Sequence, residues 1–152
     1  MLNVYAHTGT LYFTEGKVTT KGGQLVSGNF TIDMKSIKTT DSNYDAKKGT
    51  TAEKLVGHLS SADFFDVVNY PASTFTFTSV NGNEANGTLK IRGKENQETV
   101  KNITLNEADG KLTAKGTLTF DRKKYGVAYD MATTDMIISN DIELEINLTG
   151  KK

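Results

Sequence analysis

The sequence IELEINL, residues 142–148, alternates strictly between apolar and polar side chains. Successive side chains of a β-strand point to opposite faces, so this pattern predicts a strand with one apolar and one polar face. The same period of two recurs along most of the chain. Further alternating runs are Leu11–Phe13, Phe30–Met34, Phe75–Phe77, Leu89–Ile91, Ile103–Leu105 and Leu112–Phe120.

Glycine-containing dipeptides separate these runs and are typical of hairpin turns. They are Glu15-Gly16, Gly22-Gly23, Asn81-Gly82 and Asp109-Gly110, and Asn86-Gly87 lies close enough to end the same loop as Asn81-Gly82. The pattern indicates about eight strands, each with one apolar face. Closing such a sheet on itself removes its exposed edges, so we predict an all-β, antiparallel, eight-stranded barrel.

The alternation stops between Thr50 and Tyr70. Thr50 and Glu53 have the spacing of a capping box, and Leu55 and Leu59 lie four residues apart on one helical face. We therefore expect a short helical insertion at about residues 50–66, with its first helix starting at Thr50. Ser60, Ser61 and Asp63 could start a second helical turn that runs through Phe64 and Phe65.

Composition excludes several classes of function. The chain of 152 residues is long enough for one domain with its own core, which we predict to span residues 1–152. Lys and Arg number 18, as do Asp and Glu, and this balance argues against nucleic-acid binding. There is no cysteine and there are two histidines, so we expect neither a metal site nor a cofactor. No apolar run reaches the length of a membrane span, and the first residues do not have the pattern of a signal peptide.

Few residues suggest catalysis. Ser60-Ser61 lies near His58, but the strand–serine–helix turn that exposes a nucleophile is missing. For His58 we favour a histidine at a helix end, hydrogen-bonded to a loop, over a polar contact at the mouth of a cavity. We expect no catalytic residues and no enzymatic activity.

Two charged motifs have simple structural interpretations. Residues 63–66 combine two acids with Phe64 and Phe65, and we interpret them as a cover whose rings plug one end of the barrel. Asp121-Arg122 is expected to form a surface ion pair at a turn. The alternative is that Arg122 donates to the head group of a ligand at the barrel rim.

A set of motifs covers nearly the whole chain. They are HTGT (7–10), SGNFTIDMKSI (27–37), LVGHLSSADFF (55–65), YP (70–71) with TFTF (74–77), GTLKIRG (87–93), DR (121–122) with YGV (125–127), and NDIEL (140–144). Together they resemble the YceI-like family. The resemblance implies a lipocalin-like barrel that holds a polyisoprenoid or another long-chain amphiphile, has no catalytic activity and is exported to the periplasm or secreted.

The start of the chain differs from this family pattern. Members begin with a further strand before the HTGT motif, so we expect that strand to be short or absent here. Because no signal peptide is recognised, a cytoplasmic location stays open.

We predict that the apolar faces line a pocket for a long tail, with His58, Arg122 and Tyr125 near its head group. The full predicted set is Leu11, Phe13, Phe30, Ile32, Met34, His58, Phe64, Phe65, Phe75, Phe77, Leu89, Ile91, Leu118, Phe120, Arg122, Tyr125, Leu144 and Ile146. Alternation alone is equally compatible with a filled barrel that serves as a protein-interaction or stress-related structural module. A lipid hydrolase is the third hypothesis, and two chains could pair as a homodimer if the ligand is longer than one barrel.

Overall fold

The computed structural model describes residues 9–40, 51–127 and 141–151. Over these ranges the chain forms seven β-strands, one α-helix and one 3-10 helix. In chain order they are β1 (Gly9–Lys21), β2 (Gln24–Thr39), α1 (Ala52–Ser60), β3 (Ala72–Asn81), β4 (Glu84–Ile91), β5 (Lys94–Ala108), β6 (Lys111–Asp121), η2 (Arg122–Tyr125) and β7 (Asp141–Lys151).

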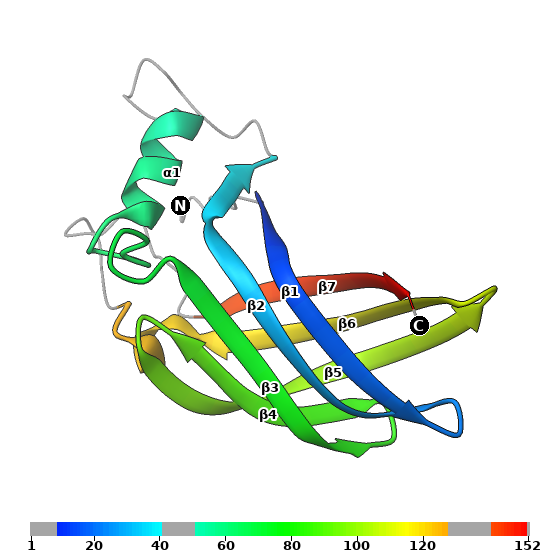
Figure 1. Cartoon of the computed structure of the whole chain (residues 1–152). Coiled ribbons are helices and arrows are strands. Elements are labelled where there is room, and N and C mark those ends of the chain that lie inside the picture. The colour runs from blue at the N-terminus through cyan, green and yellow to red at the C-terminus, as the bar shows by residue number, and fades with distance from the viewer. Residues whose placement is uncertain (1–8, 41–50, 128–140, 152) are drawn as a thin grey trace, which may run out of the picture.

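The strands form one antiparallel sheet in the order β1-β2-β3-β4-β5-β6-β7, so each strand pairs with its neighbours in sequence. Figure 1 shows this sheet curling into a half-barrel, with α1 at one end and the tips of the β1–β2 and β5–β6 hairpins at the other. The predicted all-β antiparallel fold with a helical insertion is confirmed. An eighth strand is not seen in the described ranges, where β1 and β7 are the two edges of the sheet. The expected short or absent first strand falls on residues 1–8, which lie outside those ranges.

The connections between strands confirm some predicted turns and contradict others. Two-residue turns lie at Gly22-Gly23 and Asp109-Gly110 as predicted, and the β3–β4 turn is Gly82-Asn83. A further turn, Arg92-Gly93, is not predicted by the sequence pattern; its residues have φ angles of 52° and 72°.

Two of the predicted turns are wrong: Glu15-Gly16 lies inside β1, and Asn86-Gly87 lies inside β4. A Cβ atom at Gly16 would lie 2.7 Å from Cδ1 of Phe30 on the neighbouring strand. At Gly87 it would lie 2.3 Å from the carbonyl oxygen of Thr76. These glycines therefore allow close packing within the sheet and do not turn the chain.

The predicted alternation places the apolar side chains on the concave, inner face of the sheet. Phe75 pairs with Leu89, and Leu118 pairs with Leu144, so large apolar residues from neighbouring strands share one face. The buried cluster consists of Phe75, Phe77, Ala85, Leu89, Ile91, Val100, Leu118, Phe120 and Tyr125. Its members come from β3, β4, β5, β6 and η2, so the core lies in the middle of the sheet and beside η2.

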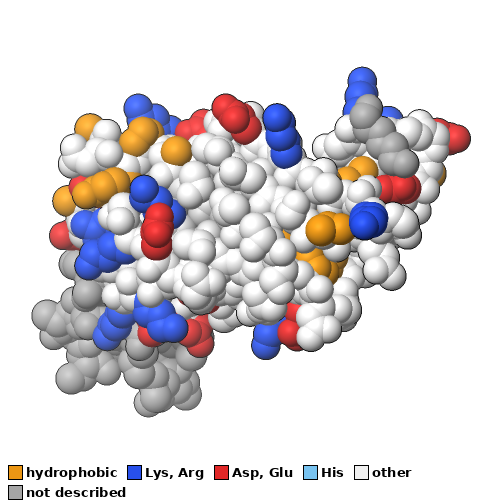
Figure 2. Space-filling model, turned by 60° about the horizontal axis from the view of Figure 1, so that its bottom comes forward, with side chains coloured by type: hydrophobic (Ala, Val, Ile, Leu, Met, Phe, Trp, Pro, Cys, Tyr) orange, Lys and Arg blue, Asp and Glu red, His pale blue; other side chains and the backbone are white. Residues whose placement is uncertain are grey.

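The outer face is polar but carries few charges over its middle. Oγ1 of Thr99 donates to Oδ1 of Asn86 at 2.6 Å, and Nε2 of Gln97 donates to Oγ1 of Thr88 at 2.8 Å. Figure 2 shows this region as a broad white area between coloured ends. Cross-strand bonds between uncharged side chains thus satisfy much of the outer surface.

Helix α1 begins one residue later than predicted. Thr51 is its N-cap, and the Thr51 hydroxyl accepts a hydrogen bond from the backbone N–H of Lys54 at 3.1 Å. The predicted capping box at Thr50 is therefore wrong, because the capping bond joins the N–H of Lys54 to the hydroxyl of Thr51. After α1, the backbone N–H of Phe64 donates to the carbonyl of Ser61 at 3.0 Å, in a series of turns that leads to β3.

Candidate ligand-binding face

Phenyl rings from three neighbouring strands line part of the inner face. The ring centroids of Phe13 and Phe30 are 5.4 Å apart, and those of Phe30 and Phe77 are 6.3 Å apart with an interplanar angle of 19°. Phe75 lies 5.9 Å from Phe77. The four rings form a continuous aromatic row that runs from the edge strand β1 into the core.

Glycines on the same face determine how these large side chains lie. A Cβ at Gly28 would lie 2.4 Å from Cε1 of Phe77, and a Cβ at Gly116 would lie 2.7 Å from Cγ1 of Val100. Each glycine leaves space that a side chain from the neighbouring strand occupies. The middle of the inner face is consequently filled by the protein's own atoms.

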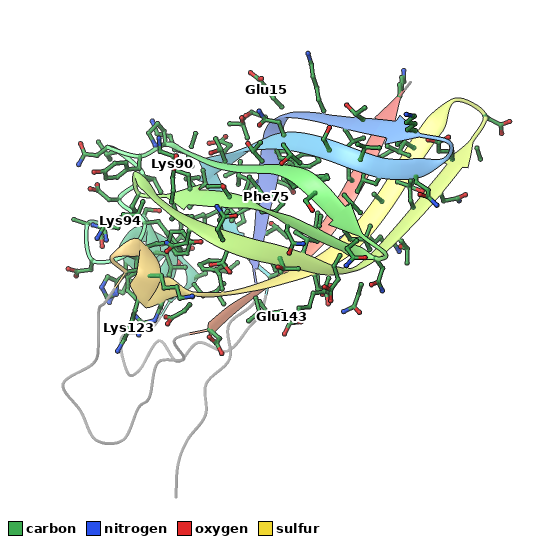
Figure 3. The ribbon with its side chains drawn as sticks, turned by 90° about the horizontal axis from the view of Figure 1, so that it is seen from below. Glu15, Phe75, Lys90, Lys94, Lys123 and Glu143 are labelled. Atoms are coloured by element: carbon green, nitrogen blue, oxygen red, sulfur yellow. The ribbon has the colours of Figure 1, made fainter. Side chains whose placement is uncertain are left out.

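Exposure of the inner face increases toward the two edge strands. Phe77 is 4% exposed in the middle of the sheet, whereas Leu11 and Phe13 on β1 are each 36% exposed. On β7, Leu144 and Ile146 are half-buried. Figure 3 places Phe75 near the middle of the sheet and the polar Glu15 and Glu143 of the edge strands on its outside. Apolar surface thus remains accessible along β1 and β7.

A polar pair interrupts the apolar face near η2. Tyr125 is fully buried, and its hydroxyl donates to Oε1 of Glu98 at 2.8 Å. Its ring meets Phe120 edge to face, with centroids 5.5 Å apart. Burial, the hydrogen bond to Glu98 and the charge of Glu98 raise the pKa of Tyr125 well above its ordinary value. Tyr125 therefore stays protonated and acts as a donor near neutral pH.

Ser73 is a second polar group on this face. It is 2% exposed, pairs with Ile32 across β2 and β3, and its Oγ atom has no hydrogen-bond partner among the described residues. A buried hydroxyl without a partner costs free energy. Ser73 is thus a buried hydroxyl without a partner among the described residues, on a largely apolar face.

Two arginines hold the end of the sheet that carries η2. Arg122 is 1% exposed, and its Nη1 donates to the carbonyl of Val127 at 2.7 Å. Nη1 of Arg92 donates to the carbonyl of Gly126 at 2.5 Å, and its Nη2 donates to the carbonyl of Ala62 at 3.3 Å. These bonds connect η2 with the β4–β5 turn and with the segment after α1.

The predicted surface position of Arg122 is wrong, because its side chain is buried. Asp121 caps η2, where its side chain accepts a hydrogen bond from the backbone N–H of Lys123 at 2.9 Å. The capping bond orders η2 and thereby places Arg122 and Tyr125 in the interior.

His58 has the structural role that the sequence analysis favoured. Its Nε2 lies 3.2 Å from Oδ2 of Asp63, and its ring meets Phe64 edge to face at 4.9 Å. The hydroxyl of Ser61 donates to the backbone carbonyl of His58 at 2.6 Å, so it is engaged with the backbone and not with the imidazole ring. Phe65 packs against the core cluster, as expected for a cover over this end of the sheet.

The structure brings most of the predicted ligand-binding residues together, at different depths. Buried are Met34, Phe64, Phe75, Phe77, Leu89, Ile91, Leu118, Phe120, Arg122 and Tyr125. Half-buried are Phe30, Ile32, His58, Phe65, Leu144 and Ile146, and Leu11 and Phe13 are exposed. Sequence reasoning missed Ser73 and Glu98. Residues 94–99 are polar on both faces of β5, so no alternation singles out Glu98.

Within residues 9–40, 51–127 and 141–151, no group of three or more His, Cys, Asp or Glu side chains could hold a metal ion. No helix in the same ranges is long and apolar enough to cross a membrane.

The geometry defines a class of small β-proteins in which an antiparallel sheet curves around an apolar face, with a helix at one end. The YceI-like domain matches residues 2–150, so the chain belongs to the YceI-like family. It is 29% identical to a UPF0312 protein of Staphylococcus aureus strain USA300 over 123 residues, covering 74% of this chain and 71% of that protein.

Solved structures share the fold. Burkholderia cenocepacia BcnA is similar with a TM-score of 0.72 and 22% identity, covering 92% of this chain and 84% of that one. A YCEI protein of Campylobacter jejuni is similar with a TM-score of 0.68 and 22% identity, covering 100% of this chain and 88% of that one.

Proposed function

We propose that this protein binds a long-chain apolar or amphiphilic molecule, such as a polyisoprenoid or a fatty acid, for storage or transport. One observation carries the proposal: the apolar inner face is left partly accessible along the edge strands, at Phe13 on β1 and at Leu144 and Ile146 on β7. Burial stabilises a hydrocarbon chain by about 0.8 kcal/mol per methylene group. A long tail would thus bind with few polar contacts.

The filled middle of the sheet determines where such a tail lies. Phe77 and its neighbours already occupy the space over Gly28, so the tail lies toward the edges, between β1 and β7. The family resemblance supports the same class of ligand.

The first test is the content of the purified protein. Organic-solvent extraction followed by mass spectrometry should release a stoichiometric long-chain species. Protein without such a species should take up a fluorescent long-chain lipid. A well-folded protein that yields no lipid and takes none up would contradict the proposal.

The second test fills the expected tail site. Ile146 faces Gly116 across β6 and β7, so Ile146→Trp would place a large ring on the accessible inner face. Uptake of the lipid should fall strongly in this variant. Asn147→Trp is the matched control, because Asn147 is exposed on the opposite face of the same strand. Unchanged uptake by Ile146→Trp would mean that the tail lies elsewhere.

The filled middle also favours a second candidate, a structural module that binds a protein partner and no lipid. Phe75, Leu89 and Leu118 are each at most 6% exposed, as in an ordinary core. The extraction and uptake experiments distinguish the two candidates. For both candidates, we propose a binding role without catalysis. We also propose a location outside the cytoplasm, as the family resemblance implies, and cell fractionation would test this location.

A further inference from the structure

Strand β7 forms a regular edge of the sheet. Its eleven residues, Asp141–Lys151, pair with β6 without a register shift, and no other strand in the described ranges pairs with it. The opposite edge strand β1 pairs with β2 through three register shifts. Bulges and prolines protect an edge strand from further pairing, and β7 has neither. The backbone groups on the outer side of β7 are therefore arranged to pair with another strand.

Both ends of β7 place like charges opposite each other. Asp141 pairs with Asp121, and Lys151 pairs with Lys111, across β6 and β7. Directly opposite side chains of like charge destabilise a sheet. A charge of the other sign on the free side of β7 would relieve this repulsion at each end.

A second copy of β7 supplies both charges in one register. When two β7 strands run antiparallel with Ile146 opposite Ile146 of the second copy, all eleven residues overlap. Asp141 then lies opposite Lys151 of the second copy, and the symmetric pair forms at the other end. Each end of β7 thus gains the opposite charge that β6 does not provide. We call this contact between two β7 strands the β7 seam.

The other charges on the outer face of β7 fit the same register. Glu143 lies opposite Thr149 of the second copy, and Glu145 lies opposite its Asn147. The one unfavourable contact is diagonal, between the two copies of Glu145, at a separation of about 7–8 Å. Lys115, opposite Asn147 on β6, is the basic neighbour of Glu145 within each sheet. A shift by two residues one way sets Glu145 directly opposite its own copy, and a shift the other way leaves the aspartates at the strand ends outside the seam.

We propose that two copies of this protein pair through the β7 seam as a symmetric dimer. The two-fold axis passes beside Ile146, perpendicular to the strands, so the two sheets join into one and their inner faces lie on the same side. Leu144 then lies opposite Leu148 of the second copy, which makes the two apolar faces continuous. A tail longer than one subunit would lie across the seam. This last point rests on the proposed lipid-binding function, whereas the pairing does not.

Sedimentation of the full chain over a dilution series tests the pairing without added lipid, and should show a monomer–dimer equilibrium. Lys151→Glu and Asp141→Lys each place like charges opposite each other at both ends of the seam. Each variant should weaken the dimer about tenfold, because two symmetric pairs change sign. Each also removes one like-charge pair between β6 and β7, so the single subunit should lose no stability.

The decisive experiment mixes the two variants, each of which repels its own copies. In an equal mixture of Lys151→Glu and Asp141→Lys, the antiparallel register sets each charge at the strand ends opposite a charge of the other sign. Mixed dimers should therefore form about as tightly as native dimers. Lys21→Glu and Glu84→Lys are matched controls, because they reverse exposed charges outside β7. Neither control should change the affinity, alone or in a mixture.

Hydrogen exchange identifies the edge that pairs. The amides of β7 should exchange more slowly at high protein concentration, while those of β1 stay unchanged. A monomer at every concentration, or a dimer whose affinity is the same in the variants and the controls, would overturn the proposal. Slow exchange of β7 that does not depend on concentration would also overturn it, and would assign this edge to another segment of the same chain.

Failure of pairing and failure of lipid binding give different results. A native protein that takes up fluorescent lipid but sediments as a monomer would contradict the dimer alone. A dimer that takes up no lipid would contradict the proposed function alone.

Discussion

Gly28 is a residue whose missing side chain shapes the inner face. Because an added Cβ would lie 2.4 Å from Cε1 of the buried Phe77, Gly28→Ala should force that ring to move. Overpacking of this kind costs about 1–3 kcal/mol, and urea denaturation would measure the loss in free energy of unfolding.

Gly57→Ala is the matched control for Gly28→Ala. Gly57 lies within α1, and a Cβ there would meet no atom within 4 Å. Alanine is favoured over glycine in helices by about 0.8–1 kcal/mol, so Gly57→Ala should leave stability unchanged or raise it. Equal destabilisation by both substitutions would disprove the packing role of Gly28.

Tyr125 is the polar residue on which the interior near η2 depends most. Tyr125→Phe removes the donor to Glu98 and leaves that half-buried carboxylate without this hydrogen bond. The free energy of unfolding should fall by about 1–3 kcal/mol, measured by denaturation near neutral pH. Tyr70→Phe removes a hydroxyl from an exposed side chain and should have almost no effect.

The raised pKa of Tyr125 adds a pH dependence to the same comparison. The ordinary tyrosine pKa is 10.0, and burial is the main cause of its increase in the folded state. The unfolded chain therefore loses this proton first as pH rises, so the stability due to Tyr125 is present below pH 10.0 and decreases above it. Native protein should lose stability above that pH more steeply than Tyr125→Phe. Parallel curves for the two would contradict this account.

At the scale of elements, α1 is attached to the core without any fully buried side chain. None of its residues is buried, so its stability depends on local interactions such as the Thr51 cap. Thr51→Ala should destabilise the helix by about 1 kcal/mol. Hydrogen exchange of the α1 amides should then become about fivefold faster, while exchange in β3 and β4 stays unchanged. A uniform increase over all elements would mean that α1 unfolds together with the sheet.

Strand faces were predictable from the sequence because alternation is a local signal. Leu144 was assigned to the inner face from its neighbours alone, and its pairing with Leu118 confirms the assignment. Turns were less predictable. The dipeptide Glu15-Gly16 predicts a turn, but Gly16 lies inside β1. Its role there is to leave space for the ring of Phe30 on the neighbouring strand, which the local sequence does not show. Arg92 was missed as a turn residue because positive φ angles are uncommon in side chains of that size.

The candidate site shows the same division between local and non-local signals. The motif residues His58 and Arg122 stood out in the sequence, yet only the fold shows that Arg122 is buried against a carbonyl. The Tyr125–Glu98 pair joins residues 27 positions apart, and no sequence spacing predicts such a contact.

At the scale of the whole molecule, the sequence predicted an antiparallel sheet closed into an eight-stranded barrel, whereas the described residues form a seven-stranded half-barrel. The sequence did not predict how the apolar face is divided. The alternation of apolar and polar residues along the strands is compatible with a barrel filled by its own side chains and with a hollow barrel. The structure shows a filled middle, with accessible apolar surface at Phe13 and Leu144 near the two edges. This division depends on side-chain packing between strands that are distant in sequence, so alternation could not reveal it.

The sequential strand order also has a consequence for how the protein is made. Strands β3 to β6, residues 72–121, follow one another through two-residue turns, so their pairings close only short loops. We expect this block to assemble first. The β1–β2 hairpin leaves the ribosome earlier, but β2 must wait for β3 across an excursion of more than thirty residues. During synthesis, the aromatic side chains of β1 and β2 are therefore exposed until the middle of the chain emerges, and a chaperone would be most useful in that interval.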